Sequence, residues 1–197
     1  AGRAKEEGRS AIEAAAELVL GLEAMNGTRD GVTLNVGSID GGSAVNIVPD
    51  LAVVRFGARA PDAESAEWTT SEVRRLFERA IARDGISGHL HGGFYRPPKP
   101  RNAAQQALFD AVHATGQAIG LELEFVDTGG VCEGNNIFAA GVPNVDTLGV
   151  RGGRIHSNEE YVVTDSFAER ATLSALLLNR LADGRLDARR IKSLMGQ

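Results

Sequence analysis

The first part of the chain has apolar residues at two distinct spacings. Between residues 10 and 25 they recur every three or four positions behind a Ser–Glu capping box, which predicts an amphipathic helix. Residues 32–36 alternate between apolar and polar, so we expect a strand there. A second strand region covers residues 44–59, and Pro49 within it predicts an interruption by a sheet edge or a bulge.

A second helix and a further strand follow. Asp62 can cap a helix that runs to about Arg83, and residues 86–95 are expected to form a strand. Two strands joined by a turn, with helices before and after them, predict an antiparallel sheet covered on one face. The next four residues, Pro-Pro-Lys-Pro, predict a domain boundary, so the first domain is expected at residues 1–98.

From residue 99 onward the pattern changes to strands alternating with helices. Helices are expected to start at Asn102 and Ser166, and strands are expected at residues 121–126 and 142–148. This alternation predicts parallel α/β structure, but two strands are too few for an independent parallel sheet buried on both faces. Residues 99–197 are therefore expected to be part of a larger sheet. The predicted fold class is α/β: an α+β domain followed by a partial parallel α/β domain.

Composition and charge exclude several classes of protein. Hydrophobic residues make up 43% and charged residues 24% of the chain, as in ordinary globular domains. The net charge is -5 and the basic residues gather only in one short terminal stretch, which argues against a nucleic acid partner. No apolar run approaches the ~20 residues that cross a bilayer, so no membrane partner is expected. Cys132 is the only cysteine, which excludes an internal disulfide and favours a reducing, cytoplasmic compartment.

The densest polar stretch, residues 149–161, contains the first candidate for chemistry. Two adjacent glycines precede His156, and Glu159 and Glu160 follow it, so one imidazole is close in sequence to two carboxylates. A loop histidine after a strand of an open α/β sheet is where ligands and metals usually bind. The alternative is a solvated surface loop, because three neighbouring groups do not by themselves make a zinc site.

A second glycine-rich loop covers residues 128–136, between a predicted strand and a predicted helix. Its backbone amides, that of Gly130 among them, could bind an anion at the start of the helix. Cys132 could act as a nucleophile only if folding brought His156 near it as a base. The alternative for this cysteine is a small packing residue.

The predicted first domain holds two further sets of candidates. His89 and His91 alternate on one expected strand and share a face, a spacing compatible with a metal, although such bare pairs are usually incidental. Arg59 and Arg96 are expected at strand ends, and Asn46 lies beside Pro49 in the interrupted region. A guanidinium paired with an amide side chain suits a carboxylate. Alternatively, Asn46 satisfies backbone groups at a bulge and both arginines are solvated.

Four motifs, taken in order, resemble the di-zinc peptidase and deacylase family of glutamate carboxypeptidase, aminoacylase, acetylornithine deacetylase and succinyl-diaminopimelate desuccinylase. The resemblance extends over about residues 1–182. The motifs that carry it are Gly-Arg-Ser-Ala-Ile, the Asn-Ile-Val-Pro segment with the Arg-Phe-Gly-Ala-Arg strand, the Gly-Gly loop, and Gly-Gly-Arg-Ile-His-Ser, at residues 8–12, 44–59, 129–136 and 152–157.

The resemblance implies a division of the chain into two parts of a larger enzyme. Residues 1–98 correspond to the family's lid, or dimerisation, domain without its first strand, and Ala1-Gly2 looks like the end of a His-Ala/Ser-Gly motif. Residues 99–197 correspond to the C-terminal segment of the catalytic domain. The family binds two zinc ions, and the resemblance makes His156 one ligand, with the other ligands and the general base expected from a preceding stretch.

The same resemblance assigns substrate contacts. Asn46, Arg59, Arg96 and Gly130 are expected to recognise a substrate carboxylate or a developing oxyanion. The family's central strand ends in Asp-hydrophobic-Arg, and this chain departs from it by having Gly57 in place of the aspartate.

The expected function is therefore that of a zinc-dependent amidohydrolase or carboxypeptidase. Its substrate would be a small molecule with an amide bond, an N-acyl amino acid or a peptide, and the lid is expected to form a homodimer. This chain alone is expected to be inactive. Two alternatives are a non-catalytic dimerisation module and a cysteine hydrolase that uses Cys132 and His156.

Overall fold

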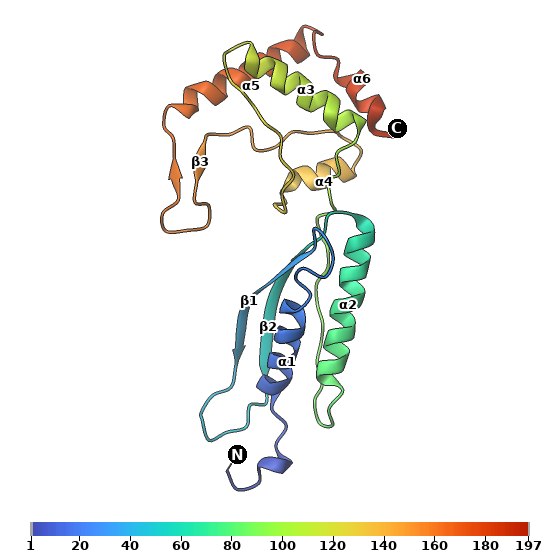
Figure 1. The fold of residues 1–197 in the computed structure, drawn as a ribbon, viewed down its shortest axis with the longest axis vertical. Coiled ribbons are helices and arrows are strands. Elements are labelled where there is room, and N and C mark those ends of the chain that lie inside the picture. The colour runs from blue at the N-terminus through green and yellow to red at the C-terminus, as the bar shows by residue number, and fades with distance from the viewer. Residues whose placement is uncertain (1, 197) are drawn as a thin grey trace. The chain divides into compact units, whose positions relative to one another are not determined.

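The computed structural model describes residues 2–196, so Ala1 of the expected His-Ala/Ser-Gly motif lies outside the described residues. The chain divides into two compact units, an N-terminal unit of residues 1–98 and a C-terminal unit of residues 99–197. Each unit combines helices with a small antiparallel sheet (Figure 1). The predicted α/β class is confirmed.

The N-terminal unit is a two-stranded antiparallel sheet packed against helices. Strands β1 and β2 pair from Thr33 opposite Arg59 to Gly41 opposite Ala52, and the register shifts once, between Val36 and Ser38. The elements in chain order are the 3-10 turn η1 (Lys5–Glu7), α1 (Ala11–Glu23), β1 (Thr33–Gly41), β2 (Ala52–Arg59) and α2 (Ala63–Ile81).

Local capping chemistry sets where the two helices of this unit begin. The Ser10 hydroxyl accepts a hydrogen bond from the Glu13 N–H at 3.2 Å, and the Asp62 carboxylate accepts one from the Ser65 N–H at 2.7 Å. The Glu13 carboxylate does not complete a capping box, because it forms an ion pair with Arg83 at 2.7 Å. Both predicted helices are confirmed.

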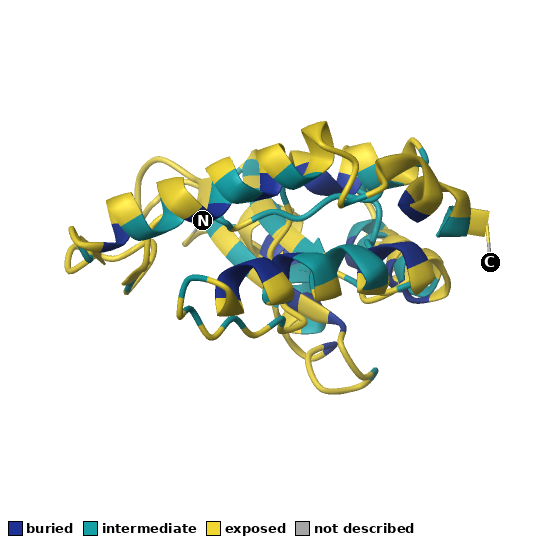
Figure 2. Ribbon diagram, turned by 90° about the horizontal axis from the view of Figure 1, so that it is seen from above, coloured by how far each residue is buried: buried dark blue, intermediate teal, exposed yellow. Residues whose placement is uncertain are grey.

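The core of the N-terminal unit lies between the sheet and the helices. Leu22 of α1 is fully buried, and Leu34 of β1 and Leu76 of α2 are 5% exposed. The helices alternate buried and exposed residues around their circumference (Figure 2). The core cluster consists of Leu22, Met25, Val32, Leu34, Val73 and Leu76.

Two expectations for this unit were wrong. Residues 44–51 form a loop, so the strand begins only at Ala52, and the bulge lies at Gly37 of β1 and not at Pro49. Residues 86–95 have no ladder partner within the described residues, although they alternate in burial and Leu90 packs against the core. Alternation predicts an extended backbone, but a strand also requires a hydrogen-bonded neighbour.

The C-terminal unit is mainly helical. The Asn102 side chain accepts a hydrogen bond from the Gln105 N–H at 2.9 Å and caps α3, as the sequence predicts. Val112 of α3 and Leu173 of α5 are 1% and 0% exposed and form the core with Leu177. The elements are α3 (Ala103–Gln117), α4 (Glu133–Ala139), β3 (Gly152–Gly153), β4 (Tyr161–Val162), α5 (Ser166–Ala182), α6 (Ala188–Ser193) and η2 (Leu194–Gly196).

The expected parallel strands of this unit are extended segments. Residues 121–126 and 142–148 join no ladder among the described residues, and the one ladder of the unit is the antiparallel pair of β3 and β4. Ser166 begins α5 but does not cap it; its hydroxyl accepts a hydrogen bond from the Arg151 N–H at 2.8 Å. Between residues 2 and 196, no helix has both the length and the apolar character to cross a bilayer.

Candidate functional site

The loop between β3 and β4 presents His156 at the surface. His156 and Arg154 both have left-handed backbone conformations, with φ of 66° and 57°, which non-glycine residues rarely adopt. The Ser157 hydroxyl donates to the Arg154 carbonyl at 2.7 Å, and the His156 N–H donates to the Glu160 carboxylate at 3.2 Å. These contacts hold the exposed imidazole on a defined hairpin.

The carboxylates beside His156 are engaged within this loop. Glu159 forms an ion pair with Arg154, and Glu160 accepts from the His156 backbone. Across residues 2–196, no group of three or more His, Cys, Asp or Glu side chains is placed to hold a metal ion. Catalytic zinc takes about three protein ligands. At this loop the described residues therefore supply one imidazole and do not fit a complete zinc centre.

The glycine-rich loop leads into α4 and satisfies most of its own polar groups. The Gly130 N–H donates to the Thr128 hydroxyl at 3.1 Å, so this bond must open before the amide can donate to a substrate oxygen. At the start of α4 the Cys132 sulfur accepts from the Gly134 N–H at 3.3 Å, and the Asn135 side chain accepts from the Cys132 N–H at 3.1 Å.

A polar cluster that the sequence did not reveal joins this loop to the start of the unit. Lys99 Nζ lies 2.5 Å from Asp146 Oδ2, and the Cys132 thiol donates to the same oxygen at 3.2 Å. Lys99 is largely buried, with 16% of its side chain exposed. The thiol is therefore a structural donor to a carboxylate, and the described contacts give it no imidazole partner.

The electrostatics of this cluster favour an ionised Asp146. Burial raises the pKa of Asp146, but hydrogen bonds from Lys99 and from the Cys132 thiol outweigh burial, and the pKa lies below its ordinary value of 3.8. A pKa that is lowered in the folded state stabilises the fold above the unfolded value, and this contribution is lost as the pH falls through the folded value.

We expect the C-terminal unit to lose stability on acidification below about pH 4, the pKa of an unfolded aspartate. Asp146→Asn should flatten this part of the stability profile, because the carboxamide of asparagine does not titrate in this pH range. Hydrogen exchange of the α3 amides between about pH 3 and 6 measures the effect. The matched control is Asp127→Asn, since Asp127 is 93% exposed in the same unit; an equal flattening in both variants would contradict the assignment.

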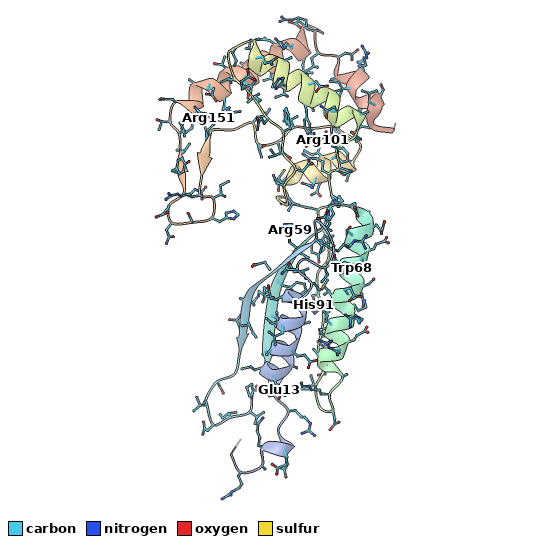
Figure 3. The ribbon with its side chains drawn as sticks, in the orientation of Figure 1. Glu13, Arg59, Trp68, His91, Arg101 and Arg151 are labelled. Atoms are coloured by element: carbon cyan, nitrogen blue, oxygen red, sulfur yellow. The ribbon has the colours of Figure 1, made fainter. Side chains whose placement is uncertain are left out.

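The predicted substrate-binding residues of the N-terminal unit do not converge on one point. Arg59 ends β2, is exposed and donates to the Ala58 carbonyl at 3.0 Å (Figure 3). Asn46 lies in a turn of the loop that leads into the other end of β2 and is also exposed. Eight strand residues span about 23 Å, so Asn46 and Arg59 of one chain cannot bind the same carboxylate. Arg96 is half-buried in the stretch that follows residues 86–95.

The remaining histidines have different surroundings. His113 of α3 is half-buried, and its Nδ1 lies 2.9 Å from the Leu123 carbonyl oxygen, which ties residues 121–126 to α3. His89 and His91 are both exposed on the extended segment after α2.

Comparison with known proteins identifies the N-terminal unit. Residues 1–85 match the family model of the peptidase dimerisation domain. The chain is 28% identical over 156 residues to the succinyl-diaminopimelate desuccinylase of Nitrosospira multiformis and 31% identical over 153 residues to that of Bordetella avium. These alignments cover 75% and 74% of this chain and 39% of each desuccinylase.

The fold is also that of solved peptidases. A tripeptidase structure from Staphylococcus aureus matches 98% of this chain and 48% of its own with a TM-score of 0.71, at 23% identity. The chain thus spans about half the length of the tripeptidase and less than half of the desuccinylases. The resemblance expected from the sequence motifs is confirmed: residues 1–85 match the M20 peptidase dimerisation domain, and most of the chain is similar to part of two succinyl-diaminopimelate desuccinylases.

Proposed function

We propose that the chain is the C-terminal portion of a zinc-dependent amidohydrolase or carboxypeptidase. In this proposal residues 1–98 are its lid domain and residues 99–197 are the last segment of its catalytic domain. The match of residues 1–85 to the peptidase dimerisation domain carries the proposal. The names of its relatives, desuccinylase and tripeptidase, support an amide bond in an N-acyl amino acid or a peptide as the target.

The proposed roles follow from the chemistry of each side chain. His156 would be one zinc ligand, because its imidazole is exposed while the loop around it is held by internal hydrogen bonds. Bound zinc would polarise the amide carbonyl and acidify a water. The general base and the other ligands would come from another part of the polypeptide, so we expect no hydrolysis by residues 1–197 alone.

Arg59, Arg96 and Asn46 are proposed to recognise a substrate carboxylate or the developing oxyanion, and Gly130 to donate its N–H to the substrate. A guanidinium offers two parallel hydrogen bonds to a carboxylate. Because Arg59 and Asn46 lie at opposite ends of β2, at most one of them would contact a given carboxylate within one subunit.

A further strand beside β2 is part of this proposal. Within the described residues β2 pairs with β1 only, and residues 86–95 are extended without a partner. An unpaired edge presents N–H and C=O groups that another strand can satisfy. The expected first strand of the lid would supply these bonds.

Zinc titration of the chain by calorimetry tests whether the metal site is divided between this chain and another part of the polypeptide. We expect no stoichiometric, tight zinc binding, because a single imidazole provides one of about three ligands. Tight binding of one ion per chain that His156→Asn abolishes would show that the chain holds the complete centre, and the proposal would then fail.

The match to a dimerisation domain also favours a second candidate, a non-catalytic module that forms a homodimer through the N-terminal unit. Both candidates include a dimer in a cytoplasmic setting, and they differ in what precedes the chain. The hydrolase requires the remaining ligands and the general base in the same reading frame ahead of residue 1. Sequencing the transcript of this gene distinguishes the two.

A further inference from the structure

The side chains of His89 and His91 both project away from α2. Gly88 lies so close to that helix that an added Cβ would come within 3.0 Å of Phe77, and Leu90 packs against the core. Side chains alternate along an extended backbone, so residues 89 and 91 face the opposite side. Both are exposed, and His91 is labelled in Figure 3.

The two imidazole rings are close enough to share one ion. Their centroids lie 6.1 Å apart, and their planes are tilted by 33°. An ion bound by both would lie about 2 Å from each nitrogen and so about 3.2 Å from each centroid, which places the centroids about 5 Å apart at a tetrahedral angle. Rotation of the two exposed side chains about their torsion angles can bring the ring centroids to that separation.

Nothing in the surroundings competes for these rings. Between residues 2 and 196, neither ring takes part in a hydrogen bond or ion pair, and each lies in contact with the other ring. Gly92 and Gly93 follow directly, and a Cβ at either position would meet no atom within 4 Å, so a hydrated ion can approach. Neutral imidazole is a ligand that suits nickel, copper and zinc.

We propose that His89 and His91 form a two-imidazole site for a divalent transition-metal ion. The site is independent of the proposed hydrolase function and does not involve His156. Two protein ligands leave coordination positions to water, so bound metal exchanges readily. Metal binding requires both imidazoles to be in their neutral form.

Nickel titration of the full chain by calorimetry tests the site, at about pH 7.5, where histidine is ordinarily neutral. We expect one Ni²⁺ per chain. His89→Asn or His91→Asn should each weaken binding about 100-fold, the low end of the gain that joining two binding groups in one chain gives. His156→Asn is the matched control and should leave the affinity unchanged. Circular dichroism of each variant verifies the fold.

Three outcomes would overturn the site. Binding could persist in the double variant H89N/H91N, or it could disappear in H156N. The third outcome is two weakly bound ions per chain, each removed by one substitution, which would mean independent histidines. None of these bears on the hydrolase proposal, which would fail if this chain alone bound zinc tightly through His156.

Discussion

Replacing Leu173 by alanine is expected to destabilise the C-terminal unit by about 2–5 kcal/mol. Leu173 lies on α5 with none of its surface exposed and packs in the core with Val112 and Leu177. The substitution removes buried apolar atoms and leaves a cavity, and both changes lower stability. The better helix propensity of alanine offsets only a few tenths of a kcal/mol.

Hydrogen exchange of the α3 and α5 amides reports this loss, because these helices form the core of the unit. Leu178→Ala makes the same chemical change on the same helix at a position that is 66% exposed. This control should change stability by no more than about 0.5 kcal/mol. Similar losses in both variants would mean that the core of the unit does not lie where α3 and α5 meet.

Replacing Gly134 by alanine is expected to disturb the cluster of Lys99, Cys132 and Asp146. The added Cβ would lie 2.6 Å from Asp146 Oδ2 and 2.7 Å from Asn144 Oδ1. Such overpacking costs about 1–3 kcal/mol, while the helix propensity of alanine returns at most about 1 kcal/mol. Subtracting about 1 kcal/mol from this cost leaves a net destabilisation of about 0–2 kcal/mol, so the overpacking is the larger effect over most of the range.

Alkylation of Cys132, the only thiol of the chain, measures the disturbance directly. When Asp146 is displaced, the thiol loses its acceptor, so alkylation should be faster in Gly134→Ala. Gly149→Ala is the matched control, since a Cβ at that position meets no atom within 4 Å. An unchanged alkylation rate in Gly134→Ala would show that the cluster adapts without cost.

Helix starts were predictable from the sequence because capping is local. Ser10, Asp62 and Asn102 each accept a hydrogen bond from an N–H three residues further along the chain. Strands were predictable only in part. Residues 86–95 and 121–126 have the expected alternation, but the neighbour that turns an extended segment into a strand is not encoded within the segment itself.

The candidate site, like the strands, was predictable only in part. His156 is a candidate because glycines and carboxylates surround it in the sequence, and its role stays a prediction. The contact of Lys99 with Asp146 spans 47 positions, so no local pattern reveals it. The separation of Asn46 from Arg59 likewise required the path of β2, because both residues had been expected to bind one carboxylate.

The left-handed turn around His156 lowers the entropy cost of binding a ligand there. The hairpin adopts its shape through hydrogen bonds among its own residues. Its backbone has therefore given up its conformational freedom before any ligand arrives. A ligand that binds the imidazole meets a preorganised loop. Binding is therefore not weakened by the free energy of ordering that segment.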